Sequence, residues 1–386
     1  MIFLSVALGN IYMFQDAKLD MVYPRKLPSS TVENEWLEDF PKINFKRVLI
    51  LSGANACGKT VFGKALCMIN NYISGRNINQ ESSWLDIKKV MFDKELPTTF
   101  EVEFLTAETS QAHKLSVAFD QDGLVEESYA CIDLQRNESQ AAMYKRLREA
   151  KPVSYYHKKK ENHDIPNAGF SSVAVSQGKM QIPSRWNYRL CELDNSSGSQ
   201  GKIKAHDTNI IKTFLSAFDS SITEVTSIAS ESYKIVFSNG EHVLIDKGKL
   251  LDPDRLSRGT HEAIDLAMFY ELMKNEDFGD STTFYLDEML AYSHTEAEQS
   301  ILNLLIETLP RHSQLFYSTH NYDILDMNLP VHSHVFLKKD QYSEFIQPEK
   351  LGFNQNDRSL LGYVKNDVFG TLPDMSVISK RSFENE

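Results

Sequence analysis

Eight consecutive residues have the types and spacing that bind phosphate. They fit the pattern GxxxxGK[ST] and are Gly53, Ala54, Asn55, Ala56, Cys57, Gly58, Lys59 and Thr60. The glycines let backbone N–H groups turn inward around a phosphate, and the N-terminus of a following helix adds positive potential. We expect Lys59 to contact the β- and γ-phosphates of ATP and the Thr60 hydroxyl to ligate Mg²⁺. A chance glycine turn is the disfavoured alternative, because strand, helix, lysine and threonine would all have to coincide.

Two adjacent carboxylates follow an apolar run later in the chain. Asp287 and Glu288 come directly after Thr283–Leu286, at the C-terminal end of an expected strand, where open α/β sheets bind ligands. Asp287 would hold the Mg²⁺ shell, directly or through water, and Glu288 would orient or deprotonate the attacking water. The alternative is a helix-capping turn, which is less favoured beside a P-loop that needs such a pair.

A serine and a glycine precede a predicted helix between these two motifs. Ser257 and Gly259 lie in Leu256–Thr260, where a hydroxyl and backbone N–H groups at a positive helix end would form a second anion site. Taken alone, the segment is better explained as an ordinary helix N-cap. Its place in the order of the motifs favours the anion site.

His320 comes just after another apolar strand, Leu315–Ser318, which follows the acidic pair along the chain. From there an imidazole could form a hydrogen bond with the γ-phosphate or the attacking water. A lone histidine is more often structural, but the neighbouring motifs favour the functional interpretation. Glu288 and His320 are therefore the candidate catalytic residues.

The elements that must position these side chains can be predicted from hydrophobic periodicity. Arg47–Leu51 is a short apolar run typical of a buried strand, and Val61–Ile73 has the apolar stripe of a helix. A strand, a helix and a strand later in the chain indicate a parallel α/β core. These segments are Thr283–Leu286, Thr295–Thr308 and Leu315–Ser318. Further half-buried strands are predicted at Phe100–Phe104 and Leu115–Phe119.

Composition and charge narrow the class of protein. The 386 residues include 41 Lys and Arg against 53 Asp and Glu, so the formal net charge is −12. This acidity disfavours a general nucleic-acid coat or a polybasic membrane binder. Four cysteines without a CxxC pair are typical of a reducing cytosol, and no apolar run is long enough to span a bilayer. We therefore expect a cytoplasmic protein without a membrane partner.

The four motifs in this order resemble the head of ABC-type ATPases, in the variant found in RecF, the SMC proteins and the OLD-like AAA ATPases of bacteria. Leu256–Thr260 matches the LSxGx signature, and Asn55 stands where the RecF and SMC group favours asparagine. The opening Leu4–Phe14 and parts of residues 336–373 are similar to the two ends of such proteins.

Three features depart from that pattern. Cys57 replaces the usual Ser or Gly of the P-loop, at a position that contributes mostly backbone, and Arg258 occupies the variable position of the signature. The family's Q-loop glutamine is not assigned, with Gln80, Gln111 and the segment near Phe92 as candidates only.

The resemblance implies an ATPase whose two heads sandwich two ATP molecules head to tail. Across each γ-phosphate, Ser257 and Gly259 of one subunit would face a set of residues of the other. That set is Lys59, Thr60, Asp287, Glu288 and His320. ATP would hold the dimer or higher oligomer together, and hydrolysis promoted by Glu288 would loosen it. The implied cofactors are ATP and Mg²⁺, and the first implied partner is a second copy of the chain.

The resemblance also implies an α/β fold in three regions. Residues 1–120 would form the N-terminal half of an ABC ATPase head, with an antiparallel β subdomain and the Walker A motif on a mixed or parallel sheet. Residues 121–215 would form a compact, mainly helical inserted lobe. Residues 216–386 would complete the head with the signature, the Walker B strand, a D-loop at Ser293-His294 and the switch residue His320.

Residues 145–160 interleave basic and aromatic side chains. Such a pattern could follow a nucleic-acid backbone and stack on bases. In an acidic protein we favour the simpler interpretation, a solvated basic face.

The remaining hypothesis concerns what the ATPase controls. No obvious acidic set follows residue 340 of the kind that forms the nuclease domain of OLD proteins. Short ATPases without that domain resemble standalone AAA-type subunits of anti-phage defence and abortive-infection systems. The leading hypothesis is an ATPase that senses infection and controls a separately encoded nuclease or toxin. Two alternatives stay open: a RecF- or SMC-like DNA repair ATPase, and a non-catalytic scaffold, against which Glu288 argues.

Overall fold

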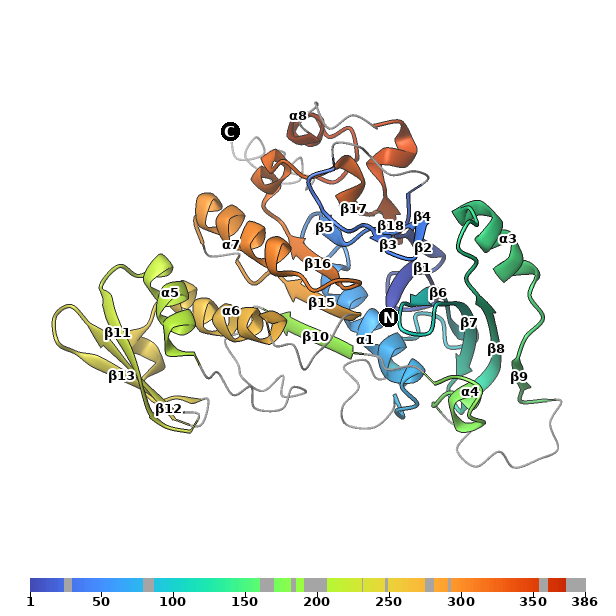
Figure 1. Ribbon diagram of the computed structural model, residues 1–386, viewed down its shortest axis with the longest axis horizontal. Coiled ribbons are helices and arrows are strands. Elements are labelled where there is room, and N and C mark those ends of the chain that lie inside the picture. Colours follow the sequence, from blue (N-terminus) through green and yellow to red (C-terminus); the bar gives the residue numbers. More distant parts are fainter. Residues whose placement is uncertain are drawn as a thin grey trace, which may run out of the picture.

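Two six-stranded sheets with helix α1 (Lys59–Ile73) between them form the centre of the molecule (Figure 1). The computed structural model describes residues 1–23, 30–78, 87–159, 170–181, 185–190, 207–230, 232–246, 249–274, 281–290, 293–353 and 360–372. Apolar side chains of α1 and of both sheets share one hydrophobic core. The helix that follows the P-loop is therefore buried along most of its length.

The first sheet is mainly parallel and has the strand order β10-β15-β16-β5-β17-β18. Its strands are β5 (Val48–Ser52), β10 (Arg185–Leu190), β15 (Thr282–Asp287), β16 (Gln314–Thr319), β17 (His334–Lys339) and β18 (Ser343–Ile346). Strands β15, β16, β5 and β17 run parallel, and β18 returns antiparallel to β17. The three central strands are buried on both faces, which explains their nearly continuous apolar sequence.

Helices α6 (Arg258–Lys274) and α7 (Thr295–Thr308) cover the face of this sheet opposite to α1 (Figure 1). Phe269 of α6 packs edge-on against Phe284 of β15, with ring centroids 5.5 Å apart. Helix α5 (Thr208–Phe218) packs beside α6. This side has its own hydrophobic core, separate from the one around α1.

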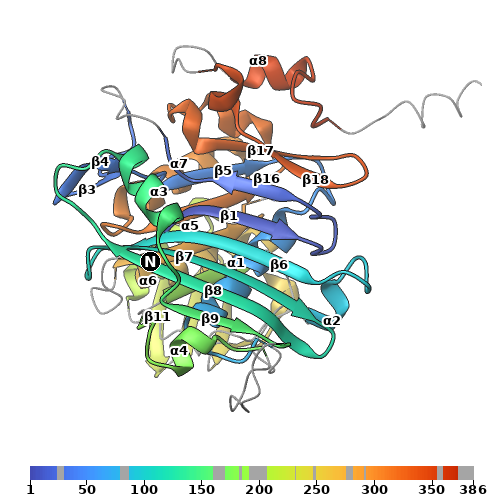
Figure 2. The same cartoon turned by 90° about the vertical axis from the view of Figure 1, so that its right-hand side faces the viewer.

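The second sheet is antiparallel and has the order β2-β1-β6-β7-β8-β9. Its strands are β1 (Ile2–Gly9), β2 (Ala17–Asp20), β6 (Thr98–Thr106), β7 (Gln111–Asp120), β8 (Gly123–Asp133) and β9 (Ser154–His157). Tyr72 of α1 packs edge-on against Phe100 and Phe119 on the inner face, at 5.5 Å in both pairs. Helix α3 (Gln140–Glu149) lies across part of the outer face (Figure 2).

Smaller elements surround these layers. Strands β3 (Trp36–Leu37) and β4 (Phe40–Asn44) form a two-stranded sheet; β11 (Ile222–Ala229), β12 (Ser232–Phe237), β13 (His242–Asp246) and β14 (Lys249–Leu250) form a four-stranded one. The short helices are α2 (Ile87–Val90), α4 (Val173–Ser176) and α8 (Leu360–Lys365), with 3₁₀ turns at Pro253–Arg255, Tyr322–Asp326, Val331–Ser333 and Pro348–Leu351. Within the described ranges, no helix has the length and apolar character needed to cross a bilayer.

The α/β prediction, with an antiparallel N-terminal sheet and a P-loop on a parallel sheet, is confirmed by this topology. The division of the chain differs from the expected one. Residues 121–215 do not form a mainly helical lobe where the structure describes them: β8 and β9 belong to the antiparallel sheet, and β10 pairs with β15. Of the helices that the structure describes there, α3 and α4 are separate short elements, and the first part of α5 falls within the range.

A buried carboxylate explains why part of this segment is integral to the antiparallel sheet. Glu127 of β8 accepts hydrogen bonds from the backbone N–H groups of Val173 (3.1 Å) and Ala174 (2.7 Å), and from the Tyr72 hydroxyl. Helix α4 is thereby attached to both the antiparallel sheet and α1. Burial raises the pKa of Glu127.

Candidate functional site

The P-loop connects β5 to α1 and requires its glycines for steric reasons. Gly58 has a φ of 111°, and a Cβ there would lie 2.9 Å from the Phe14 ring. A Cβ on Gly53 would lie 2.6 Å from the Leu337 carbonyl oxygen. Between them Ala56 also takes a left-handed conformation, with φ 62°. The backbone of residues 53–58 is therefore shaped by close packing against the loop that connects β1 to β2 and against β17.

Lys59 joins the two strongest motifs. Its Nζ donates to the carbonyl oxygens of Gly53 (2.9 Å) and Ala54 (3.2 Å), and it forms an ion pair with Glu288 Oε1 at 3.2 Å. The Lys59 side chain is 3% exposed and that of Glu288 is 32% exposed. The amine is thus held at the inner end of the loop, while the carboxylate reaches solvent.

Strand register places the predicted polar residues at one edge of the parallel sheet. Asp287 on β15 lies opposite Ser318 on β16, and Thr319 lies opposite Ser52 on β5. The acidic pair, the residue before His320 and the start of the P-loop therefore meet at the C-terminal ends of three adjacent strands. This is the edge at which open α/β sheets bind ligands.

Ser318 contacts both residues of the acidic pair, the side chain of Asp287 and the backbone of Glu288. Its hydroxyl donates a hydrogen bond to Asp287 Oδ1, and its carbonyl oxygen accepts from the Glu288 N–H at 3.1 Å. Glu288 takes a left-handed φ of 53°, which turns its side chain away from the strand direction. Asp287 is completely buried. One serine on the neighbouring strand thus fixes the positions of two acidic residues with different expected roles.

Two protein ligands are available for the expected metal ion. Thr60 is half-buried in the first turn of α1, and Asp287 is buried at the end of β15. Over the described ranges, no group of three His, Cys, Asp or Glu side chains is arranged to hold a metal. Mg²⁺ needs no such group, because it usually takes one or two protein ligands together with phosphate oxygens and water. The residues present fit this requirement.

His320 follows β16 and is exposed. The residues around it are held by Glu298 of α7, which accepts hydrogen bonds from Tyr317, Thr319 (3.2 Å) and Asn321 (2.7 Å). Glu298 is 1% exposed, and burial raises its pKa. The turn that presents His320 is therefore anchored to the helix behind the sheet.

The signature segment begins helix α6. The Ser257 hydroxyl accepts a hydrogen bond from the Thr260 N–H at 3.2 Å and pairs with the Thr260 hydroxyl at 2.7 Å, which is an N-cap arrangement. Ser257 is exposed, whereas Gly259 is buried. Within the described ranges, no hydrogen bond or ion pair connects either residue to the P-loop. The fold thus gathers Lys59, the acidic pair and His320 at one edge, and does not join the signature to them.

Cys57 contributes its backbone to the loop. Its carbonyl oxygen accepts a hydrogen bond from the Ser343 hydroxyl at 2.7 Å, so β18 supports the P-loop from the side. Cys57 is 2% exposed, and burial raises the pKa of its thiol although Lys59 opposes this effect.

Sequence patterns did not identify two residues that position the loop. The buried Tyr285 hydroxyl donates to the Lys59 carbonyl oxygen at 2.7 Å, and Ser343 makes the contact with Cys57. Tyr285 resembles any apolar strand residue in the sequence, and Ser343 is 286 residues away from its partner. Of the Q-loop candidates, Gln80 lies outside the described residues and Gln111 donates to Asp133 on the neighbouring strand. The segment near Phe92 stays a candidate, and the Phe92 ring packs edge-on against Tyr342 at 5.8 Å.

Three basic side chains of residues 145–160 form ion pairs within the chain. The pairs are Arg146–Glu138 (2.6 Å), Arg148–Glu103 (3.8 Å) and Lys158–Asp120 (3.0 Å). Lys160 lies outside the described residues.

Two SMC heads are among the solved structures that this chain resembles. The SMC head domain from Thermotoga maritima is 12% identical with a TM-score of 0.44, and the match covers 90% of this chain and 99% of that one. An SMC head bound to the C-winged helix domain of ScpA is 13% identical with a TM-score of 0.47, over 91% and 100% of the two chains. No protein-family model matches the sequence, and no curated protein matches it either. The function is therefore inferred from the residues of the chain.

Proposed function

We propose that this protein binds ATP at its P-loop and hydrolyses it. The observation that carries the proposal is the Lys59–Glu288 ion pair of 3.2 Å, which brings the phosphate-binding lysine and the candidate base to the same point. Lysine, a hydroxyl in the first helical turn and a carboxylate pair at the adjacent strand end are the parts that phosphoryl transfer to water requires.

Each residue has a role in this proposal. Lys59 exchanges its carbonyl and carboxylate partners for the β- and γ-phosphates. Glu288 accepts a proton from the water that attacks the γ-phosphorus, while ADP leaves with the electrons of the broken P–O bond. His320 forms a hydrogen bond with the γ-phosphate or the attacking water. Thr60 and Asp287 would hold Mg²⁺, which would supply positive charge to neutralise the phosphates.

We further propose that two chains form the complete site. Ser257 and Gly259 stand at the N-terminus of a long helix, where backbone N–H groups attract anions, and no hydrogen bond or ion pair of the described residues joins them to their own P-loop. A head-to-tail dimer with two ATP molecules at its interface would bring this helix end to the γ-phosphate of the other subunit. Higher oligomers that use the same contact are equally compatible.

The biological role that we favour is regulation of an effector. The order of motifs resembles standalone ATPase subunits of bacterial anti-phage defence, which act with a separate nuclease or toxin. A RecF- or SMC-like repair ATPase is the second candidate. The internal ion pairs of residues 146–158 favour the first, because they leave less free positive charge for DNA.

The test is ATP turnover measured against protein concentration, with size-exclusion chromatography in the same buffers. The wild type is compared with Glu288→Gln, and Glu296→Gln on the exposed side of α7 serves as the charge-matched control. We expect turnover that rises more steeply than linearly, and a larger species of Glu288→Gln that persists only with ATP. Linear turnover without a change in size would contradict the shared site. Tight ATP binding without turnover would favour the alternative in which the protein is a non-catalytic scaffold.

A further inference from the structure

Glu298 of α7 is a buried carboxylate that accepts hydrogen bonds from a single turn of the chain. Its Oε1 accepts from the Tyr317 hydroxyl at 2.5 Å and from the Thr319 hydroxyl at 3.2 Å, and its Oε2 accepts from Asn321 Nδ2 at 2.7 Å. All three partners donate, and an ionised carboxylate, which only accepts, matches this set. The three partners alternate along the chain and lie on both sides of His320.

The Thr319 hydroxyl links this carboxylate to the backbone around His320. A hydroxyl has one hydrogen to donate. That hydrogen points to Glu298, and the hydroxyl oxygen accepts from the Asn321 N–H at 3.0 Å. The Asn321 Oδ1 in turn accepts from the Asp323 N–H at 3.0 Å. The backbone from 319 to 323 is therefore held by two side chains whose orientation Glu298 sets.

The His320 ring depends on that backbone for its position. The residue is exposed, and over the described ranges no hydrogen bond or ion pair reaches its imidazole. Its charge nevertheless acts on Glu298. Burial raises the pKa of Glu298, and the three hydrogen bonds and the charge of His320 oppose this effect. Asn321 Nδ2 also donates to the Thr295 hydroxyl at 3.2 Å, so the first turn of α7 supports the same turn.

We propose that Glu298 is the positioning residue for His320. Its buried carboxylate faces the turn, so it acts through His320 and not on the nucleotide. The inference rests on the proposed hydrolysis of ATP, in which the imidazole reaches the γ-phosphate or the attacking water. A displacement of about 1 Å in a group that contacts the reacting atoms can cost about 10²-fold in rate. A buried charge costs free energy unless hydrogen bonds compensate it, and in the described structure those bonds come from the turn of His320.

The test exchanges the donor and the acceptor of the Glu298–Asn321 pair. Glu298→Gln keeps the shape but replaces one acceptor by an NH₂ group, so either Asn321 or the two hydroxyls lose their acceptor. Asn321→Asp sets a second carboxylate against the first. In the double variant Glu298→Gln, Asn321→Asp the new amide donates to the new carboxylate, its oxygen accepts from the hydroxyls, and the net charge is unchanged. Each single variant should lower kcat at least about tenfold, and the double variant should return to within about threefold of the wild type.

Two further measurements separate positioning from a general structural effect. Affinity for a fluorescent ATP analogue should change by less than about twofold in all three variants, because the P-loop is untouched. In a His320→Ala background, Glu298→Gln should change kcat by less than about twofold, because a residue that acts through His320 has no effect once the ring is removed. Urea titration verifies that each variant folds.

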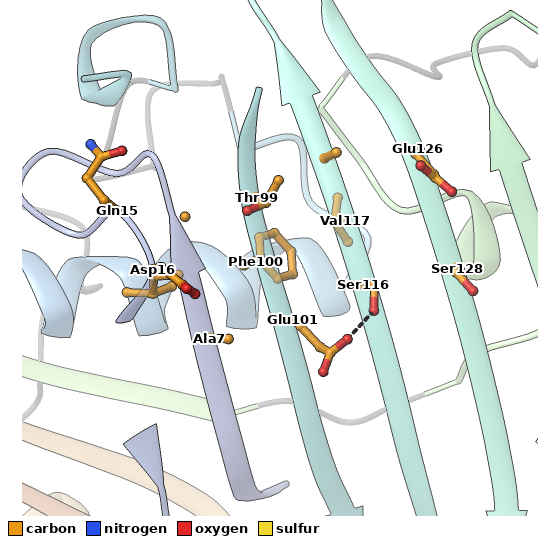
Figure 3. Close-up of a pocket in the computed structure, with 13 residues that line it drawn as sticks. Ala7, Gln15, Asp16, Thr99, Phe100, Glu101, Ser116, Val117, Glu126 and Ser128 are labelled. Atoms are coloured by element: carbon orange, nitrogen blue, oxygen red, sulfur yellow. Dashed lines mark hydrogen bonds between the residues drawn. The ribbon is translucent and has the colours of Figure 1, made fainter. Parts of the chain in front are cut away.

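The matched control is Glu101→Gln on the outer face of the antiparallel sheet. Glu101 lines a hollow of about 380 Å³ there, and its Oε2 accepts from the Ser116 hydroxyl at 2.9 Å (Figure 3). The control removes the same charge and also alters a carboxylate that accepts from a hydroxyl, but in the other sheet. It should leave kcat within about twofold of the wild type.

The imidazole signal of His320 tests the contact without nucleotide. In a proton–carbon correlation spectrum of the full chain, this signal is the one that His320→Ala removes. It should move in Glu298→Gln and return to its wild-type position in the double variant. A chain without ATP turnover would refute the proposed ATPase, and the His320 signal would then decide this inference by itself.

The proposal is overturned if the His320 signal stays in place in Glu298→Gln. It is also overturned if Glu298→Gln lowers kcat by the same factor with and without His320, because the effect would then be a general structural one. A double variant that folds but recovers neither kcat nor the signal would overturn it as well. If Glu298→Gln does not fold, Asn321→Ala takes its place in the comparison with His320→Ala and in the spectrum, because it removes the 2.7 Å hydrogen bond from the half-buried side of the pair.

Discussion

Replacing Glu288 with Gln should separate ATP binding from ATP hydrolysis. In the structure Glu288 Oε1 lies 3.2 Å from Lys59 Nζ, so carboxylate and phosphate compete for one amine. Two unit charges at about 4 Å attract by about 4 kcal/mol at an effective dielectric of 20, and solvent around a partly exposed carboxylate reduces the net value to roughly 1 kcal/mol. Removing the competitor should therefore tighten ATP binding by about fivefold.

Turnover should move in the opposite direction. If Glu288 is the general base, Glu288→Gln should lose about 10²- to 10⁴-fold in kcat. Affinity is measured by equilibrium titration with a fluorescent ATP analogue, and kcat by phosphate release at saturating ATP. Glu296→Gln is the matched control and should leave both unchanged. A kcat within tenfold of the wild type would refute the role of Glu288 as base. Weaker ATP binding would refute the competition for Lys59.

Three further predictions concern residues around the site. Gly58→Ala should lower the free energy of unfolding by about 1–3 kcal/mol and abolish ATP binding, because φ 111° and the Phe14 ring exclude a methyl group; urea titration and ATP titration measure this. Burial raises the pKa of Glu298 above 4.5, so the native state binds more protons than the unfolded chain above that pH. The wild type should then lose stability relative to Glu298→Gln as pH rises from 4.5, by at most about 1.4 kcal/mol per pH unit, and a gap that is constant between pH 5 and 8 would contradict this. Burial also raises the pKa of Cys57, so iodoacetamide at pH 8 should modify it at least about tenfold more slowly than in the urea-unfolded chain, as followed by mass spectrometry.

The parallel sheet was predictable because its strands are buried on both faces. Such strands appear in the sequence as short apolar runs, so side chains such as Leu49 and Phe284 are expected in the core, and both are buried. The polar residues just after those runs must then lie at one edge, so Lys59 and Glu288 could be placed together without a structure. The number of residues between Lys59 and Glu288 does not predict their contact. The rule that ligand-binding residues follow the carboxyl ends of parallel strands does predict it.

The region after residue 120 was harder to predict, for a physical reason. Strand β8 lies at one side of a half-exposed sheet, and polar side chains such as Glu126 and Ser128 alternate with buried ones. Helix α3 has a clear start at Ser139, whereas the strands beside it have no comparably strong sequence signal. Contacts such as that of Ser343 with Cys57 depend on tertiary packing alone, and no local sequence pattern predicts them.

The position of β5 in the parallel sheet has a consequence for synthesis of the chain on the ribosome. Val48 pairs with Leu315, and His334 lies on the other side of Ile50. At about 5–20 residues per second, the apolar strand that precedes the P-loop waits tens of seconds for either neighbour. Until then both of its edges can pair with other chains. The nascent chain therefore depends on chaperones or on early cover by α1, and the sheet edge that holds Lys59 and Glu288 is complete only after β16 and β17 have been synthesised.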